Sequence, residues 1–227
     1  KNPPNRSIMR RTVIMALLSD AVRALHNAFR RDIEIIDAAA LESARGKPGL
    51  HDTFERFRFL NEVLGWHALG EDSVISPLLE EVAPEVYETY ERDHRALDGL
   101  FEALSRAVSV CDSLETARAT KAFKFHLDLH LDKEDAHMYR LISDRVPLPE
   151  QGRALGSMGR DMPANRFPEF VGWMFPLVGT DDRVNMTRGW QMGMPPEVFA
   201  MTAQLIEQSV GDDWPELSRL IPDLVEA

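Results

Sequence analysis

The sequence predicts an all-α protein: an up-down-up-down four-helix bundle with a C-terminal extension that is partly helical and rich in Pro, Gly and Trp. Four long runs carry apolar residues at three- and four-residue steps, the period of a helix that packs along one side. Short breaks separate the runs, and short connections make successive helices pack antiparallel. Signals for β-strands are weak along the whole chain.

The length and composition indicate one core with an appendage. A chain of 227 residues with 44% hydrophobic and 28% charged residues is typical of a globular protein and too short for two large domains. We expect the bundle in residues 1–150 and the extension in residues 151–227, where it packs on the bundle or on a partner. A homodimer through the extension is one such arrangement.

Charge and cysteine content exclude several classes of protein. The net charge of −11 argues against a nucleic-acid surface, which needs clustered Lys and Arg. No apolar stretch of the sequence is long enough to span a bilayer. Cys111 is the only cysteine, so an intrachain disulfide is excluded, and so are zinc or iron–sulfur sites whose cysteine ligands all come from one chain. We expect a cytoplasmic protein without nucleic-acid or membrane partners.

The first two predicted helices cover about residues 11–44 and 53–82. The first has apolar residues such as Leu18, Val22 and Phe29 at helical spacing, and the Gly and Pro residues of positions 46–49 end it. In the second, Pro77 is expected to kink or shorten the C-terminal end, because proline lacks the backbone N–H that a helix interior uses.

The third predicted helix begins after Pro84, and the fourth covers about residues 113–142, before Pro147 and Pro149. The extension is expected to contain short helices at residues 196–210 and 215–220. Its tryptophans argue that it packs on something, since disordered segments are poor in aromatic residues. They are Trp173, Trp190 and Trp214.

Six of the seven histidines fall in predicted helices, and His51 falls in a predicted loop. The first three helices carry one each, and the fourth carries three: His26, His67, His94, His126, His130 and His137. His26 and His94 each lie near the middle of their helix. The chain therefore resembles two helical hairpins related by pseudo-symmetry.

A His-x-x-x-Glu-Asp segment occurs twice, beginning at His67 and at His130. Four residues apart on a helix, an imidazole and a carboxylate share a face and can bind one metal ion at about 2.0–2.2 Å. A glutamate has two oxygens and can bridge two ions about 3.5–4 Å apart. One such pair alone is usually a surface pair. The repetition, together with imidazoles that would be costly to bury without a cation, favours a paired metal site.

This order of residues resembles the hemerythrin-like, or HHE cation-binding, family, whose pattern over four helices is His, His-x-x-x-Glu, His and His-x-x-x-Glu. The resemblance covers roughly residues 11–146. It implies a non-haem site for two iron ions in which Glu71 and Glu134 are the bridging carboxylates. The complete set of implied ligands is His26, His67, Glu71, His94, His130 and Glu134.

The sequence departs from that of the oxygen-carrying members of this family. Those have a second histidine one turn from the third-helix ligand and a final His-x-x-x-x-Asp, whereas here Tyr90 and Asp98 flank His94 and the last motif ends in Glu134. This departure argues against a reversible oxygen carrier. Tyr90 and His126 each lie one turn before an implied ligand. His126 is a candidate for an additional ligand, for a residue that orients a carboxylate, or for a plain core histidine. Tyr90 is a candidate for a ligand, a hydrogen-bond donor or a redox residue, and its alternative is a tyrosine of the bundle core.

A rival di-iron pattern is also present. Glu91-x-x-His94 and Glu134-x-x-His137 have the Glu-x-x-His spacing of ferritin-like carboxylate bundles. That arrangement would leave His26, His67 and His130 without a role, so the histidine-rich site is preferred. The ligand types alone allow zinc or manganese as well as iron.

A centre of about four imidazoles and two carboxylates suits iron that binds O2, peroxide or nitric oxide. We expect the protein to sense or detoxify such a small ligand. The alternatives are a di-iron oxidase or oxygenase-type enzyme that acts on an organic substrate, and an iron-handling protein. The sequence does not decide whether the centre turns over, and it assigns no catalytic residue.

Overall fold

The computed structural model describes residues 17–226, and within this range the chain forms helices and no β-strand. This confirms the all-α prediction. The predicted start of the first helix, at residues 11–16, lies outside the described residues. The bundle is built from four long helices: α2 (Leu17–Ala44), α3 (Leu50–Gly70), α5 (Pro84–Ser109) and α6 (Ser113–Lys133).

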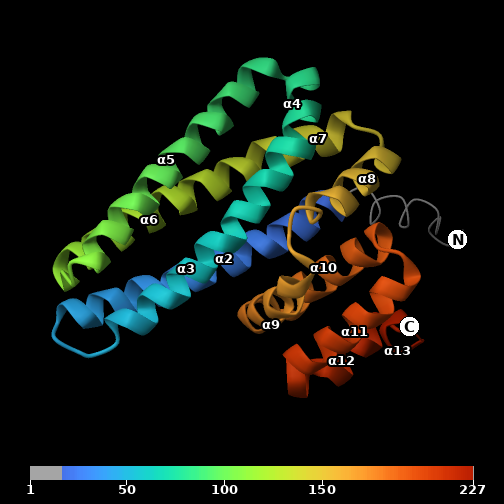
Figure 1. Cartoon of the computed structure of the whole chain (residues 1–227). Coiled ribbons are helices and arrows are strands. Elements are labelled where there is room, and N and C mark those ends of the chain that lie inside the picture. The colour runs from blue at the N-terminus through green and yellow to red at the C-terminus, as the bar shows by residue number, and fades with distance from the viewer. Residues whose placement is uncertain (1–16, 227) are drawn as a thin grey trace, which may run out of the picture.

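Successive bundle helices run in opposite directions, as predicted (Figure 1). The α2–α3 and α5–α6 connections lie at one end of the bundle, and the passage from α3 to α5 lies at the other. Helix α2 packs along α3 and α6, and α5 packs along α6. The packed faces carry the apolar residues of the helical pattern, and Phe29, Ile33, Leu60 and Leu127 are fully buried there.

Two of the predicted helices are each interrupted by one wide turn. Helix α3 passes into the π-helical turn η1 (Glu71–Ile75) before α4 (Ser76–Val82), and α6 passes into η2 (Glu134–Met138) before α7 (Tyr139–Arg145). Pro77 lies in the first turn of α4, where a missing N–H is tolerated. Neither π turn contains a proline, and α7, which follows the second π turn, contains none either. Proline is therefore not the shared cause of the two interruptions.

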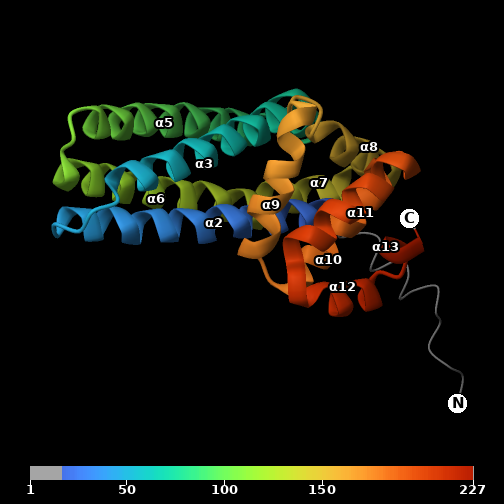
Figure 2. The same cartoon turned by 60° about the horizontal axis from the view of Figure 1, so that its bottom comes forward.

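The extension consists of short helices, of which the first ones in the chain pack against the bundle and the last ones pack on those. Their bounds are α8 (Leu148–Met158), η3 (Ala164–Arg166), α9 (Phe167–Leu177), α10 (Thr180–Gly193), α11 (Pro196–Val210), η4 (Gly211–Asp213), α12 (Trp214–Leu220) and α13 (Asp223–Glu226). Helices α11 and α12 confirm the two helices predicted for this region. Helices α9 to α13 lie beside the part of the bundle that is distant from the α2–α3 connection (Figure 2).

Helices α9 and α10 contact α2, and buried residues of the extension join the same apolar core as those of the bundle. A polar contact fixes this packing: the indole Nε1 of Trp173 donates a hydrogen bond to Oδ2 of Asp32 at 2.9 Å. Asp32 is completely buried and also accepts a hydrogen bond from Arg56. Helix α8 crosses residue 150, so no break between helices marks the predicted division at that position. The division stays a prediction.

In the described part of the chain, no helix is both long enough and apolar enough to cross a membrane.

Candidate metal centre

Six buried or largely buried side chains meet between the four bundle helices and form two overlapping groups. One group contains His26, His67, Glu71 and Glu134, and the other contains His94, His130 and the same two glutamates. In each group, one ligand atom per residue lies within 4.8 Å of all the others. Each histidine pair comes from one helical hairpin, α2–α3 or α5–α6, in agreement with the predicted pseudo-symmetry.

Each glutamate directs its two oxygens toward different histidine pairs. Oε1 of Glu71 lies 3.3 Å from Nε2 of His67, and its Oε2 lies 3.4 Å from Nε2 of His94. Glu134 repeats this arrangement: Oε1 lies 3.1 Å from Nε2 of His130, and Oε2 lies 3.6 Å from Nε2 of His26. Both carboxylates therefore span the two groups, which is the arrangement a bridging ligand needs.

The spacing of these atoms is suited to metal ligation. Two ligand atoms that are each about 2.1 Å from one ion lie roughly 3.0–3.4 Å apart in octahedral or tetrahedral geometry. Nε2 of His26 and Nε2 of His67 are 3.0 Å apart, and most of the nitrogen–oxygen distances above lie in the same range. A cation bound to the ligand atoms of one group would thus take the place of the direct contacts between these side chains.

The π turns place the glutamates and the residues that follow them. Both turns begin at the glutamate of a His-x-x-x-Glu-Asp segment, and Glu71 and Glu134 are buried. A π turn adds one residue to the helix and is frequent at functional sites. Because each π turn begins at the glutamate, the histidine before it stays one α-helical turn away from the glutamate. The π turn changes only which of the later residues face the bundle interior.

Several polar atoms of the centre lack hydrogen-bond partners among the described residues. They are Oε2 of Glu71, both side-chain oxygens of Glu134, both ring nitrogens of His94 and Nδ1 of His130. The 3.4 Å contact between His94 and Glu71 is not aligned as a hydrogen bond. Buried polar groups are rarely left unpaired, and buried carboxylates usually pair with a cation or bind a metal. This donor set is therefore suited to metal ions.

The two glutamates have opposite pKa shifts. Burial by itself would raise the pKa of Glu71, but the imidazoles of His67 and His94 lower this pKa well below its ordinary value. Burial raises the pKa of Glu134 well above its ordinary value, and the negative charges of Glu71 and Asp135 add to the rise. The protein alone thus accommodates one carboxylate charge here, and a second needs added positive charge.

Three histidines of the centre have shifted pKa values, and the shifts differ in direction. Burial lowers the pKa of His26, although its hydrogen bond to Asp135 acts in the opposite direction. Burial, together with the nearby His94 and His67, lowers the pKa of His130 to about 3. Burial would lower the pKa of His94 as well, but Glu71 raises it above the ordinary value. Neutral imidazole is the form that binds a metal.

Two tyrosines lie beside the centre. The hydroxyl of Tyr139 donates a hydrogen bond to Oε1 of Glu71 at 2.5 Å, and its ring lies edge-on to that of His26. Tyr90, the candidate from the sequence, donates instead to the backbone carbonyl of Lys133 at 2.9 Å. Tyr90 thus supports the helix backbone immediately before Glu134, while Tyr139 touches one of the glutamates directly.

The sequence pattern gave no signal for Tyr139. Tyr139 lies five residues after Glu134. In an ordinary α-helix this spacing would place Tyr139 on a different face of the helix from Glu134, and so away from the centre. The π turn η2 returns it to the same face, because π-helical hydrogen bonds join residues five apart. Local sequence patterns predict α-helical faces well, but they do not locate a π turn.

Other candidate residues lie away from the centre. His126 is exposed, and its Nδ1 faces the carbonyl of Ala122 at 3.1 Å. Glu91 and His137, which the ferritin-like pattern requires, are exposed, as is His51. The structure therefore brings together the six residues of the histidine-rich pattern and leaves the rival pattern incomplete.

An all-α bundle with two overlapping His/Glu groups between its helices defines a class of cation-binding helical proteins. The chain belongs to the hemerythrin HHE cation-binding domain family. The model of this family matches residues 17–142, which are more than half of the chain. The matched range includes all six residues of the centre.

One curated relative is the zinc finger protein BRUTUS of Arabidopsis thaliana, which is 29% identical over 168 residues. The match covers 71% of this chain but only 13% of the plant protein, so the chain corresponds to a small part of that relative. No solved structure matches the chain significantly.

Proposed function

We propose that the protein holds two non-haem iron ions and that this centre binds or reacts with O2, peroxide or nitric oxide, as a sensor or in detoxification. One ion would be bound by His26 and His67 and the other by His94 and His130. Glu71 and Glu134 would bridge the two. The observation that supports this proposal most strongly is the orientation of the two carboxylates, each with one oxygen toward each histidine pair.

The surroundings of the centre support redox or ligand-binding chemistry rather than a purely structural role. Two bridged irons would supply exchangeable coordination positions and a change of oxidation state. The chain contributes the imidazole of His130, which burial keeps neutral, a carboxylate that remains ionised, and a carboxyl group whose proton a bound cation would displace. Tyr139 holds a proton on its hydroxyl against Glu71, because burial and the carboxylate charges raise its pKa well above the ordinary value.

Packing supports a sensing role in particular. Helix α8 of the extension contacts η1, the turn that begins with Glu71. A change in how Glu71 binds metal would therefore be passed to the extension through a direct contact.

The test is metal analysis of the purified protein with its ultraviolet–visible spectrum after reduction, reoxidation in air, and addition of peroxide or nitric oxide. About two irons per chain, with bands of a bridged ferric pair that respond to these ligands, are expected. A single zinc ion or no metal would refute the proposal. Many turnovers of peroxide would assign detoxification, and stoichiometric binding without turnover would assign sensing.

A further inference from the structure

The two histidine pairs are supported differently from outside the centre. Nδ1 of His26 donates a hydrogen bond to Oδ1 of Asp135 at 2.9 Å, while its Nε2 faces the centre. Asp135 follows Glu134 in the second His-x-x-x-Glu-Asp segment, so one half of the bundle orients a histidine of the other half. A carboxylate on the outer nitrogen fixes the ring and its tautomer and strengthens the inner nitrogen as a ligand.

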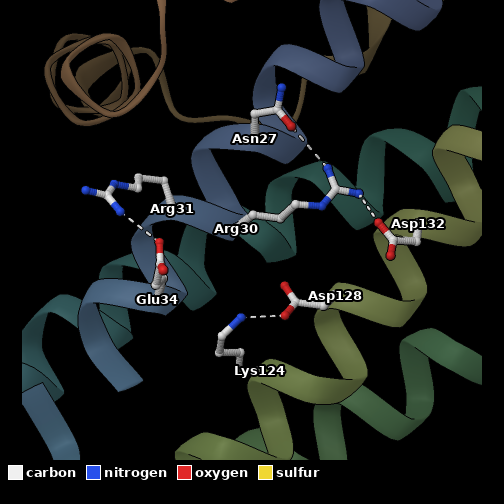
Figure 3. Close-up of a pocket in the computed structure, with 7 residues that line it drawn as sticks. All are labelled: Asn27, Arg30, Arg31, Glu34, Lys124, Asp128 and Asp132. Carbon is white, nitrogen blue, oxygen red and sulfur yellow. Dashed lines mark hydrogen bonds and ion pairs between the residues drawn. The ribbon is translucent and has the colours of Figure 1, made fainter. Parts of the chain in front are cut away.

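Asp135 is itself held in place. Its side chain is only 15% exposed, and Oδ2 accepts a hydrogen bond from Arg30 at 2.8 Å. Arg30 also bonds to Asn27 and Asp132 and lines a polar groove between α2 and α6 (Figure 3). The result is a continuous chain of contacts from Arg30 through Asp135 to His26.

The pseudo-symmetric counterpart lacks this support. Asp72 follows Glu71 as Asp135 follows Glu134, and its Oδ1 lies 3.4 Å from Nδ1 of His94. That contact is not a hydrogen bond, and Asp72 is 55% exposed. Within residues 17–226, it forms no ion pair with Lys or Arg. His94 is 16% exposed, whereas His26 is completely buried.

The second histidine of that pair is also unsupported at its outer nitrogen. Nδ1 of His130 lies 3.8 Å from Oδ2 of Asp93, which is too far for a hydrogen bond, and Asp93 pairs instead with Lys133. In the described structure, the outer nitrogens of both His94 and His130 have no hydrogen-bond partner. The difference between the two pairs is thus that His26 has a carboxylate partner at its outer nitrogen, whereas neither histidine of the second pair has one.

We propose that the two metal positions are inequivalent, with Asp135 as the positioning residue that makes the His26/His67 position the tight one. The His94/His130 position is then the exchangeable one, and it loses its ion first. This inference rests on the proposed two-metal function and adds to it a difference in metal retention between the two positions.

The test is release of Co(II), a probe ion for nitrogen and oxygen ligands, from the fully loaded protein into excess chelator. The wild-type protein is expected to release one ion quickly and one slowly. Asp135→Asn should speed the slow phase about 10–100-fold, the usual effect of losing such a partner. The matched control, Asp72→Asn, should change either phase by less than about threefold.

A spectroscopic readout separates positioning from general destabilisation. After the fast ion has left, the visible spectrum reports the slowly released Co(II) alone, and it should shift in Asp135→Asn but not in Asp72→Asn. Arg30→Gln provides a second variant outside the centre, which remains usable if Asp135→Asn does not fold. It should speed the slow phase in the same direction by a smaller factor.

The outcomes separate this inference from the proposed function. Failure of the wild-type protein to bind two ions would refute the two-metal function itself. Two bound ions that leave in a single phase, or equal effects of Asp135→Asn and Asp72→Asn, would overturn the inequivalence and leave the two-metal function intact.

Discussion

Gly70 lies directly against the backbone of Met158: a Cβ atom added to Gly70 would be 2.5 Å from the carbonyl oxygen of Met158. Gly70 is the last residue of α3 and precedes Glu71, and Met158 is the last residue of α8. The extension thus approaches the backbone next to a centre residue with no space between them. This close approach explains a glycine inside a long helical run, where glycine is otherwise unfavourable.

Gly70→Ala should lower the free energy of unfolding by about 1–3 kcal/mol, because backbone on both sides has to move apart. It should also weaken metal retention, since Glu71 moves with α3. Gly65→Ala is the matched control on the same helix. An added Cβ there meets nothing within 4 Å, so this variant should be neutral or more stable by up to about 1 kcal/mol. Urea unfolding and metal analysis of both variants test the prediction, and equal stability of the two would contradict it.

Single substitutions should distinguish the histidines of the centre from those on the surface. His67→Ala is expected to lose most of the bound metal, because His67 lies in contact with both His26 and Glu71. His126→Ala is expected to keep it, because His126 is exposed and faces the carbonyl of Ala122. Metal content per folded chain, with helix content from circular dichroism, is the measurement. Loss of metal in the His126 variant would show that its ring reaches the centre.

The sequence predicted the fold well where local periodicity determines it. The positions of the bundle helices follow from apolar spacing and from the Gly and Pro breaks, and α11 begins at Pro196 as expected. The meeting of His26, His67, His94 and His130 with two glutamates follows from antiparallel packing of four helices that each carry one of these histidines on the inner face.

Two kinds of feature were not predicted from the sequence. The first depends on the change of helical face at a π turn, and the second depends on contacts between residues that are far apart in the chain. Tyr139 faces Glu71 only because η2 changes the helical face. The hydrogen bond of Asp135 to His26 joins residues 109 positions apart, and the motif alone does not distinguish Asp135 from Asp72. The contact of Trp173 with buried Asp32 likewise depends on where α9 packs.

Tyr139→Phe should affect the centre, whereas Tyr90→Phe should affect only stability. Tyr139→Phe removes the hydrogen bond to Glu71, and loss of such a bond to a charged group costs about 1.5–3 kcal/mol. Tyr90→Phe removes a bond to a backbone carbonyl and should cost about 1 kcal/mol. With metal bound, the absorption spectrum should change in the Tyr139 variant and stay as in the wild type in the Tyr90 variant. Identical spectra for all three proteins would argue against a role of Tyr139 at the centre.

The opposite pKa shifts of the two glutamates predict opposite effects of removing their charges from the metal-free protein. The pKa of Glu134 is raised, so between the ordinary value of 4.5 and the raised pKa the folded state holds a proton that the unfolded state has lost. The stability this group contributes is therefore lost as pH rises through that window. Glu134→Gln avoids the loss and should be more stable than the wild type, by up to about 1.4 kcal/mol for each pH unit between 4.5 and the raised pKa.

Glu71→Gln is the matched variant, with the opposite sign expected. The pKa of Glu71 is lowered, so its charge stabilises the fold above 4.5, and this contribution is lost only as pH falls through the lowered pKa. At neutral pH the metal-free Glu71→Gln protein should therefore be less stable than the wild type, while Glu134→Gln should be more stable. Urea unfolding of chelator-treated proteins between pH 5 and about pH 8 measures both effects. Both variants should nevertheless bind less metal than the wild type, because each removes one bridging carboxylate; equal metal content in all three proteins would contradict that shared role.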